Sequence, residues 1–320
     1  MSSCSISGDE KQNKVIVIAG PTASGKTDLA IELALKVGGE IVSADSMQIY
    51  RKMDIGTAKP TLEERRGIPH HMIDIVDPDE EYNVAQFKSD ADICIDDIIN
   101  RGKVPIVAGG TGLYINSLVY NISFSETISD WKFRKHLENI ALEQGPEVLH
   151  DMLKEVDPKS AEAIHPNNVK RVIRALEVYR STGRPISEHK EESRKIPPKY
   201  DFEIFGLEVP RDLLYQRIEK RVDKMMGLGL YEEVEGLLKS GYSPDLTSLQ
   251  GIGYKEIISA IMGKCSLETA VENIKKGTRH LAKRQITWFK KTEGLKWIRT
   301  DENDIWAMIK ILTDALNNQG

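Results

Sequence analysis

Long hydrophobic runs are missing from this 320-residue chain, and no apolar stretch approaches the length that a membrane-spanning helix needs. Cysteine is scarce as well: Cys4, Cys94 and Cys265 are far apart and odd in number, which excludes a disulfide framework and a site of paired metal ligands. Such usage is typical of a reducing cytosol, so we expect a cytoplasmic protein with no membrane partner. Residues 1–13 are polar and lack the apolar core of a signal peptide, so we expect a flexible tail.

An excess of positive charge is missing too. The chain carries 44 Lys and Arg against 49 Asp and Glu, a formal net charge of −5, so its overall charge gives no sign of a nucleic-acid partner. Any surface for a nucleic acid must therefore be local. The length suffices for one large domain or two modest ones.

What the chain does contain is a phosphate loop of the form G-x-x-x-x-G-K-[ST], made of Gly20, Pro21, Thr22, Ala23, Ser24, Gly25, Lys26 and Thr27. A buried strand is predicted before it at 15–19, and a helix after it over 28–34. This order turns backbone N–H groups toward a phosphate. Lys26 brings positive charge to a phosphate oxygen, and the Thr27 hydroxyl is a ligand for Mg²⁺. The loop predicts a polyphosphate site and leaves open whether the ligand is a nucleoside triphosphate.

The first third of the chain alternates strands with helices. Further strands are predicted at 40–45, 72–76 and 104–108, and an amphipathic helix is predicted over 84–101. This alternation predicts an α/β fold similar to that of P-loop NTPases, with a mainly parallel sheet flanked by helices. Ligands of such sheets bind beyond the carboxyl ends of the strands, so we expect Asp45, Thr111 and the phosphate loop to share one pocket.

The pattern changes after residue 120. From 130 to 182 it predicts helices alone, and strand character returns at 202–207. A helical C-terminal region follows, with Pro210 at the first position of a helix and one short strand over 295–298. The predicted domains are a catalytic core made of 14–120 and 200–320 and a helical insertion over 121–199.

Two polar residues are predicted at strand ends beside the phosphate loop. Asp45 can accept a proton from a nucleophile or hold Mg²⁺, or it can simply form a turn. Thr111 can donate a hydrogen bond to a leaving phosphate oxygen, and it can also cap the helix that follows. The strand at 104–108 ends in glycines where a P-loop NTPase usually has a metal-binding Asp, which argues against routine ATP hydrolysis.

Two arginines, Arg217 and Arg221, are four residues apart on the helix after Pro210, so they share one face. Together they can clamp a diphosphate through planar, multidentate hydrogen bonds. The alternative is a solvated helix face on which they pair with Glu219 or Asp223.

Positive charge is concentrated near the C-terminus, where 275–291 holds seven basic residues and no acid. They are Lys275, Lys276, Arg279, Lys283, Arg284, Lys290 and Lys291. Gln285 and Trp288 lie among them, although Trp288 fits a core position better than a stacking one. Cations follow phosphates, and amide or aromatic groups can read or stack on bases, so the stretch predicts a surface for RNA or another polyanion. A second, weaker basic patch in the predicted insertion consists of Lys170, Arg171 and Arg174.

With these motifs in order, the sequence resembles the bacterial tRNA dimethylallyltransferases, also called isopentenyl-tRNA transferases. The matching segments are 20–27, 45–51, 54–60, 69–74, 109–114, 166–177, 251–254 and 278–288, and together they are highly specific. The resemblance implies transfer of a dimethylallyl group from dimethylallyl diphosphate to the exocyclic N6 amine of an adenosine, with release of diphosphate. That adenosine lies next to the anticodon on its 3′ side, in tRNAs that read codons beginning with U. The phosphate loop would hold the allylic diphosphate rather than ATP.

The resemblance also implies a role for each site residue. Asp45 would orient the amine and take its proton, and Thr111 would donate to the bridging oxygen of the donor. Lys26, Arg217 and Mg²⁺ would stabilise the departing diphosphate, which is bound by the loop 20–27 and Arg217, with Thr27 as the metal ligand. The residues implied in tRNA binding are Asp45, Ser46, Met47, Gln48, Thr111, Lys170, Arg171, Arg174, Gly251, Gly253, Tyr254, Arg279, Lys283, Arg284, Gln285 and Trp288.

The partners that this resemblance implies are dimethylallyl diphosphate and the anticodon stem-loop of a tRNA, acted on by a monomer. At 169–174 the family has a more glutamine- and arginine-rich run, so contacts there carry over less securely. Two other enzyme classes share parts of the pattern. An adenylate prenyltransferase would use the same chemistry on AMP or ATP, and a small-molecule kinase would share the phosphate loop, but neither needs the basic stretch at 275–291.

Overall fold

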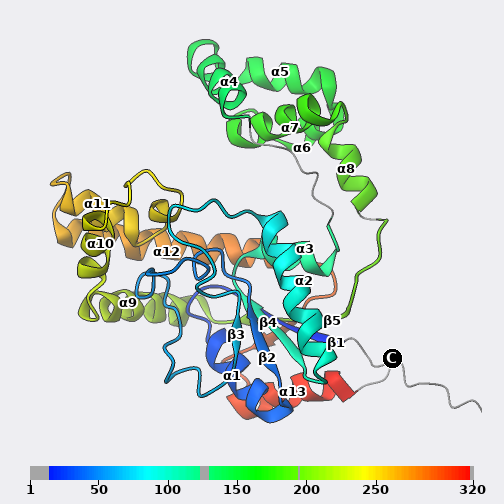
Figure 1. Cartoon of the computed structure of the whole chain (residues 1–320), viewed down its shortest axis with the longest axis vertical. Helices are drawn as coiled ribbons and strands as arrows, with labels where there is room; N and C mark the ends of the chain where they lie inside the picture. Colours follow the sequence, from blue (N-terminus) through cyan, green and yellow to red (C-terminus); the bar gives the residue numbers. More distant parts are fainter. Residues whose placement is uncertain (1–13, 123–129, 194, 318–320) are drawn as a thin grey trace, which may run out of the picture. The chain divides into compact units, whose positions relative to one another are not determined.

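The computed structural model of the chain describes residues 14–122, 130–193 and 195–317 (Figure 1). Two compact units make up the chain. Unit 1 combines Met1–Val119 with Tyr200–Gly320, and unit 2 is Tyr120–Lys199. The predicted tail at 1–13 lies outside the described residues. Across the described part of the chain, no helix is both long enough and apolar enough to cross a membrane.

A six-stranded sheet forms the centre of unit 1, in the strand order β3-β2-β4-β1-β5-β6. Its strands are β1 Lys14–Ala19, β2 Glu40–Ser43, β3 His70–His71, β4 Pro105–Gly109, β5 Asp201–Glu208 and β6 Lys296–Arg299. Every pairing between neighbouring strands is parallel. The whole of β1 is buried between β4 and β5, as expected for a strand of a parallel sheet that is covered on both faces. The predicted α/β fold with a mainly parallel sheet is confirmed.

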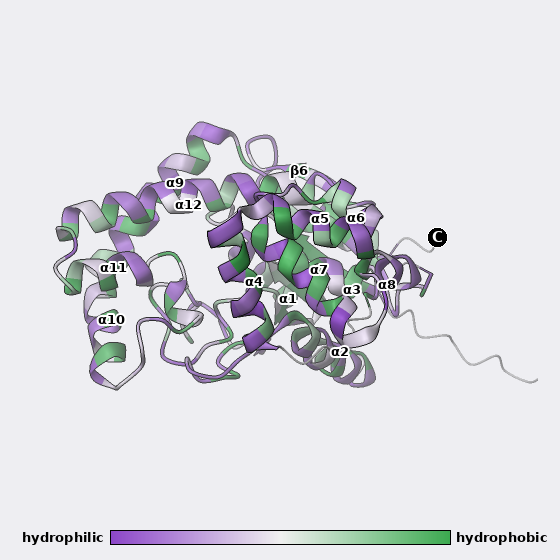
Figure 2. Cartoon of the chain, turned by 90° about the horizontal axis from the view of Figure 1, so that it is seen from above, coloured by the Kyte–Doolittle hydropathy of each residue, from purple (hydrophilic) through white to green (hydrophobic). Residues whose placement is uncertain are grey.

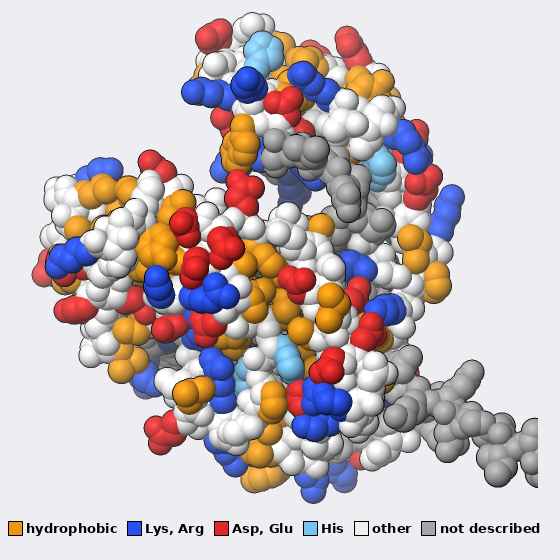
Figure 3. All heavy atoms as spheres, in the orientation of Figure 1, with side chains coloured by type: hydrophobic (Ala, Val, Ile, Leu, Met, Phe, Trp, Pro, Cys, Tyr) orange, Lys and Arg blue, Asp and Glu red, His pale blue; other side chains and the backbone are white. Residues whose placement is uncertain are grey.

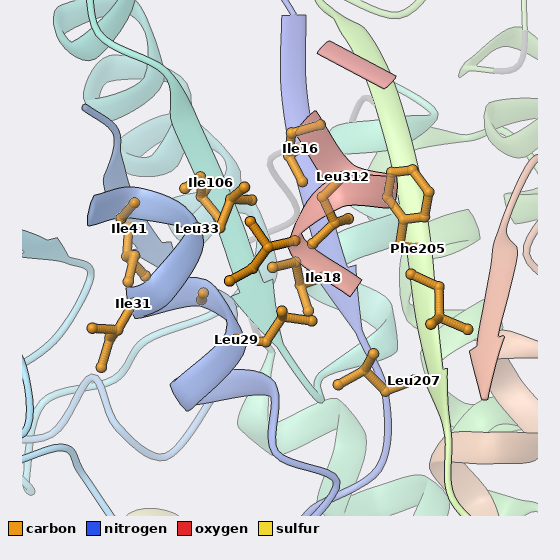
Figure 4. Close-up of a cluster of buried hydrophobic side chains, with 14 of the residues drawn as sticks. Ile16, Ile18, Leu29, Ile31, Leu33, Ile41, Ile106, Phe205, Leu207 and Leu312 are labelled. Carbon is orange, nitrogen blue, oxygen red and sulfur yellow. The ribbon is translucent and has the colours of Figure 1, made fainter. Parts of the chain in front are cut away.

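Helices flank this sheet and continue into a C-terminal helical region (Figure 1). The helices of unit 1 are α1 Lys26–Val37, α2 Val84–Asn100, α3 Gly112–Val119, α9 Arg211–Gly227, α10 Leu230–Lys239, α11 Tyr254–Ile261, α12 Leu267–Phe289 and α13 Ile305–Asn317, with a short 3₁₀ turn at Ser248–Gln250. Ile16 and Ile18 of β1 pack in one core cluster with Leu29 of α1, Phe205 of β5 and Leu312 of α13 (Figure 4). Successive strand residues point to opposite faces, so this cluster accounts for one face of the sheet.

A second core joins the C-terminal helices to the loop that follows β2. Leu230 and Val234 of α10 pack with Tyr254 of α11 and Ile274 of α12, and Met53 from the loop completes the cluster. This packing holds 45–59 against the C-terminal helices, so residues distant in the sequence meet beside the strand ends.

Unit 2 is entirely helical within the residues described. Its helices are α4 Trp131–Gln144, α5 Pro146–Val156, α6 Pro158–Ala163, α7 Val169–Thr182 and α8 Ile186–Ser193. Val172, Ile173 and Leu176 of α7 lie in its core, as their helical spacing predicts. Hydrophilic and hydrophobic residues alternate along helices such as α4 in Figure 2, which is typical of amphipathic helices.

Two details of the predicted elements are wrong. The expected strand at 72–76 does not form; β3 ends at His71, because Met72 and Asp74 adopt left-handed backbone angles that interrupt an extended chain. Only a single bridge links Val76 to Tyr50 in this part of the described chain. Pro210 is the N-cap of α9 rather than its first residue.

Candidate active site

The phosphate loop, residues 20–27, connects the end of β1 to the start of α1. Ala23 and Gly25 have positive φ angles of 62° and 92°. Gly25 is the N-cap of α1, so the free N–H groups of the first helical turn lie at the loop. The buried Ser24 hydroxyl has no hydrogen-bond partner among the described residues. Free backbone donors and an unpartnered hydroxyl are what a phosphate group can satisfy.

Lys26 brings a buried ammonium to this loop. Its Nζ donates a hydrogen bond to the Pro21 carbonyl at 2.7 Å. The pKa of Lys26 falls to about 7, chiefly because the ammonium is buried and secondarily because Arg221 repels it, while Asp45 acts in the opposite direction. An anion bound here would stabilise the charged form of the lysine.

Arg221 of α9 is the second cation at the loop. Its Nη1 donates to the Thr22 hydroxyl at 3.3 Å. Burial lowers the pKa of Arg221, against the attraction of Asp45, Asp28 and Glu64, but a guanidinium stays charged at neutral pH. Although Lys26 and Arg221 keep some exposed surface, their charged groups are buried near each other, which favours an anionic ligand.

Arg217 lies one turn before Arg221 on α9 and is partly exposed. It makes no hydrogen bond or ion pair with any residue that the structure describes. The alternative of a face paired with Glu219 and Asp223 is wrong, because these acids bind Arg279 and Lys275 of α12, each at 2.8 Å. The sequence singled out both arginines, and the structure places the second one at the phosphate loop.

Asp45 and Thr111 lie on neighbouring loops, after β2 and β4. Thr111 N donates to the Ala44 carbonyl at 3.1 Å, and Thr111 Oγ1 accepts from Ser46 N at 3.0 Å. Asp45 Oδ1 accepts from Met47 N at 2.9 Å, so it does form a turn. The charge of Asp45 also acts on Lys26 and Arg221, which places the carboxylate at the phosphate loop. The structure thus brings the phosphate loop, Asp45 and Thr111 together at the carboxyl ends of the neighbouring strands β1, β2 and β4.

The glycines around Thr111 allow three close approaches. A Cβ on Gly109 would lie 2.2 Å from the Ala44 carbonyl oxygen, and one on Gly110 would lie 2.4 Å from Nε2 of Gln285. A Cβ on Gly112 would lie 2.3 Å from the Trp288 ring. Two of these contacts come from α12, so the glycine cluster lets that helix pack directly against the site.

Several residues predicted to contact tRNA have structural partners in unit 1. Gln48 donates to the Ala58 carbonyl at 3.3 Å and accepts from the Ser43 hydroxyl at 3.1 Å. The methyl end of Met47 packs beside Gly251, where a Cβ would lie 2.5 Å away. Gly253 has a φ of 102° and is the N-cap of α11.

Tyr254 is a core residue in this structure. It is 1% exposed, its hydroxyl donates to Glu233 Oε1 at 2.7 Å, and a Cβ on Gly56 would lie 2.5 Å from its ring. Burial raises the pKa of the Tyr254 hydroxyl. Glu233 also accepts hydrogen bonds from the backbone N–H groups of Asp54, Ile55 and Gly56. This cluster fixes the loop after β2, and the Tyr254 ring is buried within it.

The basic residues of α12 differ in exposure and in ion pairing along the helix. Lys275 and Arg279 are partly buried and pair with acids of α9. Lys283 and Arg284 are exposed, and neither lies within ion-pair distance of an acid that the structure describes. Trp288 packs against Gly112 and is 37% exposed. On the face shown in Figure 3, basic and acidic side chains are interspersed over the rest of unit 1, so no large field of one sign dominates that view.

In unit 2 the predicted basic patch is partly neutralised. Arg174 pairs with Glu177 at 2.8 Å, and Arg134 binds the same carboxylate through both of its oxygens at 2.8 Å. Although burial opposes it, these hydrogen bonds lower the pKa of Glu177. Lys170 and Arg171 are exposed and have no acidic partner among the described residues.

Comparisons with known proteins indicate one family. A model described as IPP transferase matches residues 48–292, and one described as isopentenyl transferase matches 13–76. A tRNA dimethylallyltransferase from Acetivibrio thermocellus is 60% identical, over 91% of this chain and 93% of the relative. One from Pelotomaculum thermopropionicum is 52% identical, over 92% of this chain and 94% of the relative.

Solved structures agree with the sequence comparisons. The full-length tRNA isopentenylpyrophosphate transferase of Bacillus halodurans matches with a TM-score of 0.72 and 41% identity, over 96% of both chains. A eukaryotic dimethylallyltransferase acting on tRNA matches with a TM-score of 0.80 and 36% identity, over 96% of this chain and 80% of that one.

Proposed function

This chain belongs to the tRNA dimethylallyltransferase family, and we propose that it moves a dimethylallyl group from dimethylallyl diphosphate to an adenosine of tRNA. The acceptor is the exocyclic N6 amine of the adenosine 3′-adjacent to the anticodon, in tRNAs that read codons beginning with U. The observation that carries the proposal is the position of the charged groups of Lys26 and Arg221 at the phosphate loop, where both also feel the charge of Asp45. The cations suit a diphosphate, and the carboxylate suits an amine nucleophile.

The phosphate loop binds the diphosphate of the donor. The N–H groups at the start of α1 and the Ser24 hydroxyl donate hydrogen bonds to phosphate oxygens. Lys26 and Arg221 neutralise the charge that develops as the diphosphate departs. Arg217, one turn away on the same face of α9, extends this clamp. The strand β4 ends in glycine rather than in an acid, so the site is not built for routine ATP hydrolysis.

Mg²⁺ fits the residues of this site as a partner of the donor. The described residues contain no group of three or more His, Cys, Asp or Glu side chains that could hold a metal ion. Thr27 is exposed in the first turn of α1, and its hydroxyl with phosphate oxygens and water gives the oxygen ligands that Mg²⁺ prefers. Thr27 would therefore hold the ion together with the diphosphate, and the ion supplies further stabilisation of the departing negative charge.

Asp45 acts on the attacking amine, and Thr111 acts on the departing diphosphate. The N6 nitrogen forms a bond to C1 of the dimethylallyl group, and the bond from C1 to the bridging oxygen breaks with its electron pair going to the diphosphate. Asp45 orients the amine and accepts the proton that the nitrogen loses. Thr111 donates a hydrogen bond to the bridging oxygen as it becomes negative. A carboxylate, a hydroxyl and two cations thus account for every charge that moves.

The tRNA is held by the exposed cations. Lys283 and Arg284 on α12 contact phosphates of the anticodon arm, and Lys170 and Arg171 of unit 2 provide further contacts. The acceptor base must leave its stack to reach the site, which is easiest in a single-stranded loop. We propose that the enzyme works as a monomer in the cytoplasm.

Label transfer tests this function against its two rivals. The protein is mixed with labelled dimethylallyl diphosphate, Mg²⁺ and either unmodified tRNA, AMP or ATP, and we expect label in tRNA alone. Label in AMP or ATP would favour an adenylate prenyltransferase. ATP turnover without tRNA should be negligible, and rapid turnover would favour a kinase.

A further inference from the structure

Gln285 of α12 joins the two loops of the candidate site. Its Oε1 accepts a hydrogen bond from Thr22 N at 2.9 Å, and its Nε2 donates one to the Gly110 carbonyl at 3.0 Å. Thr22 belongs to the phosphate loop, and Gly110 precedes Thr111. One side-chain amide therefore bridges the loop proposed for the donor and the loop proposed to donate to its bridging oxygen, just beyond the paired ends of β1 and β4.

The surroundings pack closely against this amide. A Cβ on Gly110 would lie 2.4 Å from Nε2 of Gln285, so the approach requires glycine. On the other side, Arg221 holds the hydroxyl of Thr22. Ala23 of the same loop packs against an apolar cluster shared by α9 and α12. The tip of the phosphate loop is thus attached to α12 by a hydrogen bond and by packing, and its position depends on that helix.

The neighbours of Gln285 along α12 have the opposite environment. Lys283 and Arg284 are exposed, and no acid of the described chain pairs with them. Gln285 is partly buried, and both of its polar atoms bind backbone groups of the loops. Of three consecutive residues on this helix, Lys283 and Arg284 therefore face solvent, where phosphates can bind, and Gln285 contacts the donor loop. A displacement of this part of α12 would move both loops.

We propose that Gln285 is a positioning residue that couples tRNA binding on α12 to diphosphate binding at the phosphate loop. This inference rests on the proposed function, because it takes Lys283 and Arg284 as contacts of the tRNA. By linkage, tRNA must change the affinity for diphosphate by the same factor as diphosphate changes the affinity for tRNA. The amide does this through loop geometry, by the hydrogen bonds that it makes with Thr22 and Gly110.

Inorganic diphosphate is the probe for the test, because it fills the donor site without reacting. Its Kd is measured by calorimetry with and without saturating unmodified tRNA. In the natural chain we expect the two Kd values to differ by about 5- to 150-fold, the usual range of coupling between sites. Gln285→Met keeps the shape of the side chain and removes both hydrogen bonds, so the ratio should fall to within about twofold of one. Asn273→Ala, at an exposed position of the same helix, should keep the natural ratio.

A pair of variants at Gly110 checks that the effect arises from this contact. The methyl group of Gly110→Ala meets Nε2 of Gln285, so this variant should reduce the coupling ratio. Gln285→Ala removes the atoms that the methyl would meet. The double variant Gly110→Ala with Gln285→Ala should therefore couple as Gln285→Ala does alone, a non-additivity expected of residues in contact.

The outcomes separate the coupling from the function itself. A natural ratio of one, or an unchanged ratio in folded Gln285→Met, would overturn the coupling even if the enzyme prenylates tRNA. Thermal unfolding of each variant establishes which are folded, and the Gly110 pair decides the matter if Gln285→Met is not. Failure of the natural chain to transfer label to tRNA would instead overturn the proposed function, whatever the ratio of Kd values.

Discussion

Two pairs of cations on this chain are proposed to bind phosphate groups, and they differ in how far their charges are buried. Lys26 and Arg221 have buried charges with lowered pKa values at the phosphate loop. Lys283 and Arg284 are exposed on α12 and keep their hydration. A buried charge has lost its water and gains most from an anion that fills its site, whereas an exposed charge is screened by salt. The first pair suits one small, highly charged ligand, and the second suits the repeated phosphates of a nucleic acid.

This difference also separates chemistry from recognition. Electrostatic stabilisation of a departing diphosphate is strongest where water is excluded, as at the buried pair. Phosphate contacts on an exposed helix position an RNA but carry no sequence information. Changes at the buried site should therefore alter rates and donor affinity, and changes on α12 should alter the salt dependence of tRNA binding.

The largest effect is expected at Asp45, the carboxylate that faces the buried pair. Asp45→Asn removes the proton acceptor, so kcat should fall by about 10²- to 10⁴-fold, with little change in tRNA affinity. Single-turnover transfer at saturating donor and tRNA measures the rate, and a binding titration measures the affinity. A near-natural rate in the variant would leave Asp45 with its turn-forming role alone.

A smaller effect is expected from the arginines of α9. Arg221→Gln should weaken the binding of inorganic diphosphate by about 10- to 100-fold, as for the loss of a hydrogen bond between charged groups. Arg217→Gln should weaken it less, because Arg217 is partly exposed and has no described polar partner. Calorimetry on the two variants ranks them. The reverse order would make Arg217 the main cation of the clamp and would break the comparison between buried and exposed charges.

On α12 the comparison can be made within one helix. The double change of Lys283→Ala and Arg284→Ala should make the dependence of log Kd for tRNA on log salt shallower by about 1.4–1.8, for two phosphate contacts. Lys275→Ala with Arg279→Ala removes the same charge from positions that are already paired with Asp223 and Glu219. This matched pair should change the slope less. Equal slopes for both doubles would show that α12 acts only through its total charge.

A different kind of effect is a pH dependence of folding stability that originates at Lys26. The pKa of this lysine is about 7 in the folded chain and 10.5 as its ordinary value. Between these values the unfolded chain binds more protons, so the stability contribution of Lys26 should rise as the pH rises from 7 to 10.5. The pH dependence of stability is measured by thermal unfolding of the natural chain and of Lys26→Met between pH 7 and 10.5. Parallel curves would contradict a buried ammonium.

Much of this organisation could be predicted from the sequence. The phosphate loop and the parallel sheet follow from local patterns, and the family predicted from the ordered motifs is confirmed. Spacing could not rank Arg217 and Arg221, because residues four apart share a helix face and only the packing of α9 decides which charge is buried. The strand expected at 72–76 does not form because Met72 and Asp74 adopt left-handed backbone angles, which the residue types there do not reveal.

Contacts between residues distant in the sequence explain the features that the motifs could not predict. Gly110 and Gly112 stand out in the sequence as part of a glycine cluster. Side chains larger than hydrogen do not fit at these positions, because Gln285 and Trp288 of α12 approach the backbone there. Tyr254 lies in a motif typical of the family and fills a core instead of an exposed surface. In each case a residue type was visible in the sequence, while its partner was set by the fold.

The transfer reaction itself gives the most direct measurement. An unmodified anticodon stem-loop with adenosine at the position 3′ to the anticodon is incubated with the protein, Mg²⁺ and dimethylallyl diphosphate, beside a matched stem-loop with guanosine there. Digestion and mass spectrometry of the nucleosides locate any added group. We predict one dimethylallyl group on N6 of that adenosine and none on the guanosine stem-loop. An unmodified adenosine, or a dimethylallyl group at another position in both stem-loops, would contradict the account.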